Sequence, residues 1–170
     1  MTTLVVYESM FGATRDVAGA VGEGLATAGP VRVVEVTDLV GGPGHGALPD
    51  DLTLLVVGGP THAFGMSRPG TRADSERYGP VLSRIGVREW LEHLELPAGI
   101  SAAAFGTKLS SPLAGSAARA IGHRLRQLGG RLLLPPKDFY VPGTIGLATG
   151  ELDGARAWGV AVATAATARG

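Results

Sequence analysis

The chain has 170 residues, of which 45% are hydrophobic and 18% charged, a composition that indicates a globular protein and excludes a disordered one. The charged residues balance to a net charge of zero, which gives no case for a nucleic-acid or anionic-membrane surface. Because no cysteine is present, disulfides, thiolate metal sites and cysteine nucleophiles are excluded.

The chain shows no linker and no internal repeat, so its length predicts one domain over residues 1–170. No basic segment followed by an apolar run opens it, and the alanine-rich stretch 158–168 is too weakly apolar for a membrane span. We therefore expect a cytoplasmic protein that binds neither a membrane nor nucleic acid.

The first predicted strand is the apolar run 4–7, and a turn leads from it into a helix that ends near residues 28–30. A turn before a helix gathers unpaired N–H groups, and the helix dipole adds roughly half a positive charge there. Ser9 and Thr14 can add hydroxyl donors, so the turn suits a phosphate. The alternative is an ordinary strand-to-helix turn capped by one of these two residues.

The second predicted strand, 31–36, is interrupted by charged residues and is expected to be less buried than the first. Residues 41–46 hold four glycines and a proline and are predicted as a loop, so any helix before the third strand is short or absent. The apolar run 52–57 predicts a third strand that is buried on both faces and ends at the turn 58–60.

A polar segment, 61–86, is predicted as a long loop, and loops of this length are often functional. A helical stripe of apolar residues follows it and includes Trp90, which we assign to the core. The fourth predicted strand, 100–105, leads into the turn 106–108.

The last part of the chain predicts a helix around residues 117–128, a fifth strand at 132–134 that resumes at 139–141 after two prolines, and a final helix around 152–166. Alternating apolar strands and helices without hairpin signals are typical of a three-layer α/β/α protein with a doubly wound parallel sheet. With five strands in the order 2-1-3-4-5, the winding direction reverses between strands one and three.

Ligands of such sheets bind where the winding reverses, outside the carboxyl ends of the strands. The loops that meet there are 9–14 and 58–66, and both are rich in glycine and hydroxyl side chains, as a backbone-lined pocket requires. The turn 106–108 follows the fourth strand at the same edge. The agreement of the two main loops favours a ligand site more than either loop does alone.

The segment Ser9-Met10-Phe11-Gly12-Ala13-Thr14 resembles the phosphate loop of the flavodoxin-like family, which usually reads hydroxyl-x-hydroxyl-Gly-x-Thr. Phe11 departs from this pattern because an aromatic ring replaces a hydroxyl. The stretch from Gly58 to Met66 is similar to the Gly-x-Pro-Thr-x-Phe-Gly segment of flavodoxin-like quinone reductases, with one extra residue. The resemblance covers nearly the whole chain.

This resemblance implies a flavodoxin-like fold and a non-covalently bound flavin mononucleotide (FMN). The phosphate would rest on the N–H groups of residues 10–14, the ribityl chain along residues 60 and 61, and the ring between the loops after strands three and four. The cofactor-binding residues that it implies are Ser9, Met10, Phe11, Gly12, Ala13, Thr14, Pro60, Thr61, His62, Phe64, Gly65, Gly106 and Thr107.

Three functions stay open at this point: an electron carrier, an NAD(P)H-dependent quinone reductase, and a flavodoxin-like interaction module that binds no flavin. A carrier needs a redox partner protein, and the zero net charge argues against a basic one. In a reductase, His62 could protonate a substrate, and Lys108 or Arg68 could hold an anion. Phe11 and the lack of a stacking Trp or Tyr in the two loops motivate the third function.

Several other classes of activity are disfavoured, and no catalytic residue is assigned. The chain has no Gly-Lys-Ser/Thr sequence, which disfavours nucleotide triphosphate hydrolysis. It also has no nucleophile-elbow spacing and no His/Asp cluster with the spacing of metal ligands.

Overall fold

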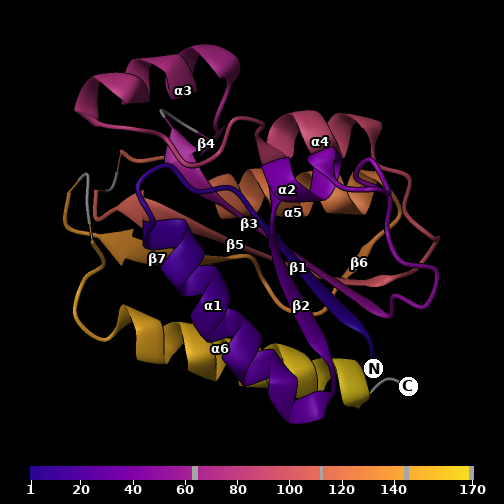
Figure 1. The fold of residues 1–170 in the computed structure, drawn as a ribbon. Coiled ribbons are helices and arrows are strands. Elements are labelled where there is room, and N and C mark those ends of the chain that lie inside the picture. The colour runs from indigo at the N-terminus through magenta and orange to yellow at the C-terminus, as the bar shows by residue number, and fades with distance from the viewer. Residues whose placement is uncertain (63–64, 112, 144–145, 169–170) are drawn as a thin grey trace.

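The computed structural model describes residues 1–62, 65–111, 113–143 and 146–168. Its strands are β1 Thr3–Tyr7, β2 Val31–Glu35, β3 Leu54–His62, β4 Gly65–Met66, β5 Ser101–Leu109, β6 Arg131–Leu132 and β7 Lys137–Val141. The central sheet is parallel in the order β2-β1-β3-β5, and the short β4 pairs antiparallel with β3 (Figure 1). β6 pairs with the start of β5 and β7 with its end, so together they form one interrupted edge strand. When β6 and β7 are counted together as the fifth strand, the predicted order 2-1-3-4-5 is confirmed.

Helices cover both faces of the sheet, as predicted. They are α1 Ala13–Leu25, α2 Val36–Gly41, α3 Pro69–Ser75, α4 Val87–His93, α5 Ala117–Gln127 and α6 Glu151–Thr167. Figure 1 shows α1 and α6 on one face and α2, α4 and α5 on the other, while α3 stands beside β4. Among the described residues, no helix combines the length and the apolar character that crossing a bilayer requires.

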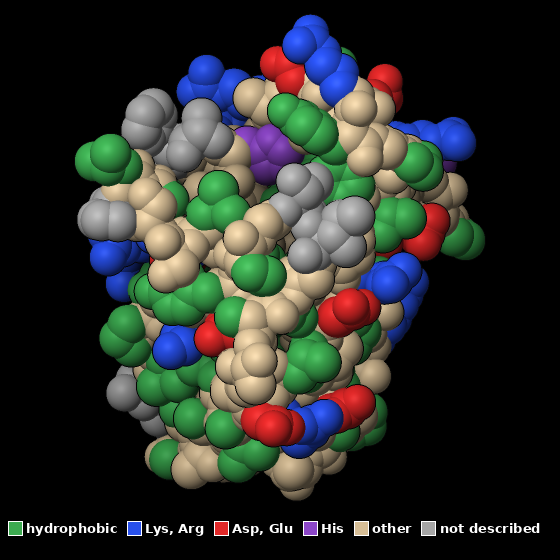
Figure 2. All heavy atoms as spheres, turned by 90° about the vertical axis from the view of Figure 1, so that its left-hand side faces the viewer, with side chains coloured by type: hydrophobic (Ala, Val, Ile, Leu, Met, Phe, Trp, Pro, Cys, Tyr) green, Lys and Arg blue, Asp and Glu red, His purple; other side chains and the backbone are tan. Residues whose placement is uncertain are grey.

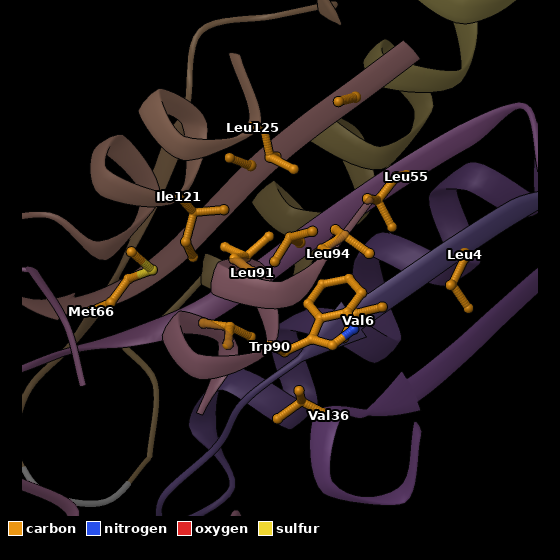
Figure 3. Close-up of a cluster of buried hydrophobic side chains, with 14 of the residues drawn as sticks. Leu4, Val6, Val36, Leu55, Met66, Trp90, Leu91, Leu94, Ile121 and Leu125 are labelled. Atoms are coloured by element: carbon orange, nitrogen blue, oxygen red, sulfur yellow. The ribbon is translucent and has the colours of Figure 1, made fainter. Parts of the chain in front are cut away.

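Two hydrophobic clusters fill the space between the sheet and its helices, because alternate residues of each buried strand point to opposite faces. In β1, Leu4 and Val6 belong to the cluster under α4 and α5, whereas Val5 belongs to the cluster under α1 and α6. Figure 3 shows the first cluster, in which Trp90 is 5% exposed and lies among the residues of the predicted helical stripe. The assignment of Trp90 to the core is confirmed.

The prediction of one long loop over residues 61–86 is wrong, because this segment contains β4, α3 and a single 3-10 turn at Glu76–Tyr78. Pro69 opens α3, where its missing N–H costs nothing. The helix gives no apolar period because its buried residue is Arg72, whose guanidinium donates to Glu89 at 3.0 and 3.2 Å. A buried face made by a paired charge is not visible in hydrophobic periodicity.

The turns predicted at residues 58–60 and 106–108 are also corrected, because β3 and β5 continue through them. Gly59 pairs with Gly106 and Pro60 with Thr107 in the parallel register. A Cβ on Gly58 would lie about 2.0 Å from the ring of Phe105, so glycine is required here by packing within the sheet rather than by a turn. β3 and β5 therefore extend beyond the carboxyl ends that the apolar runs indicate.

Candidate functional site

A cavity of about 250 Å³ lies at the carboxyl ends of β1, β3, β5 and β7. Its wall includes Leu109 and Val141 at the ends of β5 and β7, and Gly143 beyond them. Figure 2 views the molecule from this edge of the sheet, where hydrophobic side chains (green) and other side chains or backbone (tan) cover most of the central surface. The cavity therefore lies where the winding of the sheet reverses, the position at which doubly wound proteins bind ligands.

The structure brings most of the predicted cofactor-binding residues together in this cavity. Its wall contains Ser9, Met10, Phe11, Ala13, Thr14, Pro60, Thr61, His62 and Thr107. Gly12, Gly65 and Gly106 lie outside the described wall, and Gly106 instead packs against the start of α5, where a Cβ would lie 2.9 Å from the backbone nitrogen of Ala118. Phe64 lies outside the described residues. The β7 side of the wall was not predicted. The sequence does carry a signal for it, because the last predicted strand ends at residue 141, at the same edge of the sheet.

The loop between β1 and α1, residues 8–12, owes its shape to Gly12 and Ser9. Gly12 has φ of 101°, a left-handed conformation that favours glycine, and it precedes the first residue of α1. The Ser9 hydroxyl is buried and accepts hydrogen bonds from the N–H of Gly12 at 3.1 Å and of Arg15 at 3.3 Å. Ser9 thus caps α1 from inside the loop, and its oxygen is turned toward the protein.

Four backbone N–H groups of this region have no protein acceptor within the described part of the chain. They belong to Met10, Phe11, Ala13 and Thr14, and all four residues line the cavity. They lie at the positive end of the α1 dipole, where unpaired N–H groups bind anions. The expectation that Gly12 also offers its N–H is wrong, because Ser9 already accepts it.

Two threonine hydroxyls add a further donor to the cavity wall. Thr14 Oγ1 and Thr107 Oγ1 lie 2.8 Å apart, and both residues are almost fully buried. One hydroxyl donates to the other, so the accepting hydroxyl keeps its own hydrogen for a second partner. This pair joins α1 to β5 and presents a hydroxyl donor beside the free N–H groups.

His62 ends β3 and is half-buried in the cavity wall, held by its pairing with Gly65 of β4. Burial lowers the pKa of His62, and the positive charge of Arg72 lowers it further. A neutral imidazole at this position can accept or donate a hydrogen bond near neutral pH. Lys108 also lines the cavity and donates from Nζ to the backbone oxygen of Ala114 at 3.0 Å, whereas Arg68 is exposed and outside the wall.

Sequence reasoning missed Glu8, a carboxylate with no solvent exposure directly before Ser9. Its side chain accepts hydrogen bonds from the Ser67 hydroxyl and, at 3.0 Å, from the Val87 N–H, and it lies 3.9 Å from the Arg72 guanidinium. Burial raises the pKa of Glu8 to about 7, against the lowering effect of these three partners. An acid directly after an apolar strand was the available signal, but the sequence does not reveal its partners.

The strand order, the helices on both faces and the cavity at the winding reversal define a flavodoxin-like α/β fold. Solved structures agree with this. A flavodoxin from the domain Archaea is 22% identical, with 98% of this chain and 99% of that chain covered and a TM-score of 0.68. Flavodoxin 1 from Bacillus cereus is 17% identical, with 96% and 98% covered and a TM-score of 0.68.

A flavodoxin, WrbA-like protein from Agrobacterium tumefaciens is also similar, at 20% identity, with 99% of each chain covered and a TM-score of 0.61. At these identities the likeness concerns the fold alone. A scan of the sequence against protein-family models finds no match, and a comparison with curated proteins finds none either. The predicted flavodoxin-like fold is therefore confirmed, and the ligand has to be argued from the site.

Proposed function

We propose that the protein binds FMN without a covalent bond and transfers electrons through it. The observation that carries this proposal is the set of four free N–H groups, of Met10, Phe11, Ala13 and Thr14, which line one cavity at the start of α1. A phosphate dianion fits such a donor set without a lysine, because the helix dipole and the N–H groups supply the positive potential.

The residues of the cavity also fit the other parts of FMN. Pro60 and Thr61 would hold the polar ribityl chain, and the apolar side chains of Leu109 and Val141, with His62, would border the flat ring. When bound, FMN supplies a redox centre that accepts and releases electrons. The task of the protein is then to hold the phosphate, to orient the ring and to limit water around it.

Binding is tested by the visible absorption spectrum of the purified protein and by its melting temperature with added FMN or riboflavin. At about 100 times the dissociation constant, FMN stabilises the fold by about 2.7 kcal/mol, which raises the melting temperature by about 5–10 °C. Riboflavin lacks the phosphate and is expected to give a smaller rise. A colourless protein whose melting temperature does not respond to FMN would rule out this function.

The position of His62 favours a second candidate function, an NAD(P)H-dependent reductase that passes electrons to a small acceptor such as a quinone. A neutral imidazole in the cavity wall can accept a proton from a reduced substrate, and the imidazolium formed can then release it. Oxidation of NADH or NADPH in the presence of FMN and a quinone tests this candidate. Turnover that His62→Ala lowers by about 100-fold when FMN is saturating would favour the reductase over the carrier.

A further inference from the structure

The segment from Ser67 to Val87, here called the clasp segment, is fastened to the β1–α1 loop at both of its ends. The two ends meet on one side chain, because the Glu8 carboxylate accepts from the Ser67 hydroxyl at one end and from the Val87 N–H, at 3.0 Å, at the other. Arg72, inside the segment, adds its charge 3.9 Å from the same carboxylate and donates to Ser67 Oγ at 2.8 Å. Glu8 therefore closes the clasp segment into a loop directly beside Ser9.

The middle of the clasp segment pairs with the next two residues of the β1–α1 loop. The N–H of Ser83 donates to the backbone oxygen of Ser9 at 3.1 Å, and the N–H of Leu82 donates to that of Met10 at 3.0 Å. In return, the N–H of Ser9 donates to Ser83 Oγ at 2.8 Å. The Ser83 hydroxyl donates its own hydrogen to Glu35 Oε1 at 2.6 Å, so this hydroxyl both accepts and donates.

These bonds determine which way two peptide groups face. In a planar trans peptide the C=O and the following N–H point in opposite directions. Because Ser83 holds the C=O of Ser9, the N–H of Met10 points away from the clasp segment. Because Leu82 holds the C=O of Met10, the N–H of Phe11 also points away from it. These are two of the four free N–H groups that line the cavity.

We propose that the clasp segment is the positioning element of the anion site, with Leu82 and Ser83 orienting the peptide groups of the β1–α1 loop and Glu8 anchoring the segment. This inference rests on the proposed binding of the FMN phosphate. The N–H groups are then oriented before the phosphate arrives, so binding does not have to include the cost of turning them. Ser83 is a positioning residue, since its N–H holds the C=O of Ser9 and its hydroxyl, bonded to both the Ser9 N–H and Glu35, fixes Ser83 against the loop.

The test uses Ser83→Ala, which removes the hydroxyl that holds the Ser9 N–H, and Ser75→Ala as the matched control. Ser75 belongs to the same segment, but its hydroxyl donates to the backbone oxygen of Thr71 within α3 at 2.9 Å. We expect Ser83→Ala to weaken FMN binding about fivefold to tenfold, because the phosphate then has to order a loosened loop at a cost of about one hydrogen bond, and to leave riboflavin binding unchanged. Ser75→Ala should change neither, and Ser83→Thr, which keeps the hydroxyl, should restore FMN affinity.

A second measurement does not depend on flavin. In the protein without cofactor, amide hydrogen exchange of Gly12, Leu82 and Ser83, whose N–H groups are hydrogen-bonded in this contact, should be faster in Ser83→Ala than in the unchanged protein, and Ser75→Ala should match the unchanged protein. Equal exchange, or an equal weakening of FMN and riboflavin, would overturn the inference and leave the proposed function standing. Failure of the unchanged protein to bind FMN would overturn both.

Discussion

At the scale of single residues, Glu8 carries an electrostatic cost, because burial disfavours its charged form. A carboxylate with no solvent exposure loses its hydration, and the Arg72 guanidinium that faces it is shared with Glu89. Hydrogen bonds from Ser67 and Val87 offset part of this cost. The carboxyl group is consequently easier to protonate in the folded protein than in the unfolded chain, which makes the stability of the fold depend on pH.

We expect the part of this pH dependence that Glu8 causes to disappear in Glu8→Gln. The pKa of Glu8 rises from 4.5 to about 7 on folding, so between these values the folded state binds the extra proton and stability falls as pH rises. The loss amounts to about 3 kcal/mol between about pH 4.5 and 7. Burial and the hydrogen bonds from Arg72 have opposing effects on Glu89, whose lowered pKa contributes in the opposite direction in both proteins.

The measurement is urea unfolding of the unchanged protein and of Glu8→Gln at several pH values between about 5 and 8. The difference in the free energy of unfolding should shift toward the variant as pH rises, because Glu89, whose pKa is lowered, stays ionised over this range. If the free energies of unfolding of the two proteins changed with pH in parallel over this range, the result would contradict a buried Glu8 that titrates near neutrality.

A second prediction at this scale concerns Thr14, whose hydroxyl lies beside the free N–H groups. Thr14→Glu places a carboxylate where the phosphate is expected, and two like charges at about 4 Å repel by about 4 kcal/mol at a surface-like dielectric. We expect FMN affinity to fall by at least about 100-fold in a flavin titration. Thr164→Glu, at an exposed position of α6, is the control and should bind normally. Normal binding by Thr14→Glu would mean that the phosphate lies elsewhere.

At the scale of elements, the crossing of α1 and α6 depends on two glycines that let the backbones approach. A Cβ on Gly24 would lie about 2.2 Å from the backbone oxygen of Arg156, and one on Gly159 would lie about 2.4 Å from that of Val21. Neither glycine has a left-handed φ, so close packing and not backbone conformation explains why glycine stands at these two positions. The close crossing brings α6 onto the sheet face that α1 also covers (Figure 1).

Gly24→Ala should therefore lower the free energy of unfolding by about 1–3 kcal/mol, because the methyl group forces the helices apart. Gly19→Ala in the same helix is the matched control, since its added Cβ meets no atom within 4 Å. Alanine is the better helix former, so Gly19→Ala should raise stability by about 0.5–1 kcal/mol. Chemical denaturation of both variants gives the comparison, and effects of the same sign would contradict the tight crossing.

At the scale of the whole molecule, the two hydrophobic clusters lie on opposite faces of one sheet, and each contains or contacts one tryptophan. Trp90 is buried under the face of α4 and α5, and its Nε1 donates to the backbone oxygen of Gly46 at 3.0 Å. Trp158 packs on the other face, with its ring 6.2 Å from that of Phe105 and 6.3 Å from that of Phe139. The two indoles therefore report separately on the two halves of the core.

The prediction of one domain can be tested with these two probes. In Trp90→Phe and Trp158→Phe, which leave one tryptophan each, the fluorescence and circular-dichroism transitions in urea should coincide within each variant. They should coincide because strands shared by both clusters unfold only together. A fluorescence transition that precedes the loss of secondary structure in one variant would show that one face of the core unfolds separately.

What the sequence alone determined was the order of the main strands and helices, without β4 and α3, and the place of the candidate site. Apolar runs and helical stripes are local patterns, so they indicate strands, helices and the strand ends at which loops 9–14 and 58–66 meet. Only the tertiary structure decided how α3 is buried, how far β3 and β5 extend, and what holds the β1–α1 loop. These features depend on polar partners distant in the chain: Ser9 bonds to Ser83 and Glu8 to Val87, 74 and 79 positions away. Such bonds leave no periodic trace in the sequence, because either residue alone reads as an ordinary polar side chain.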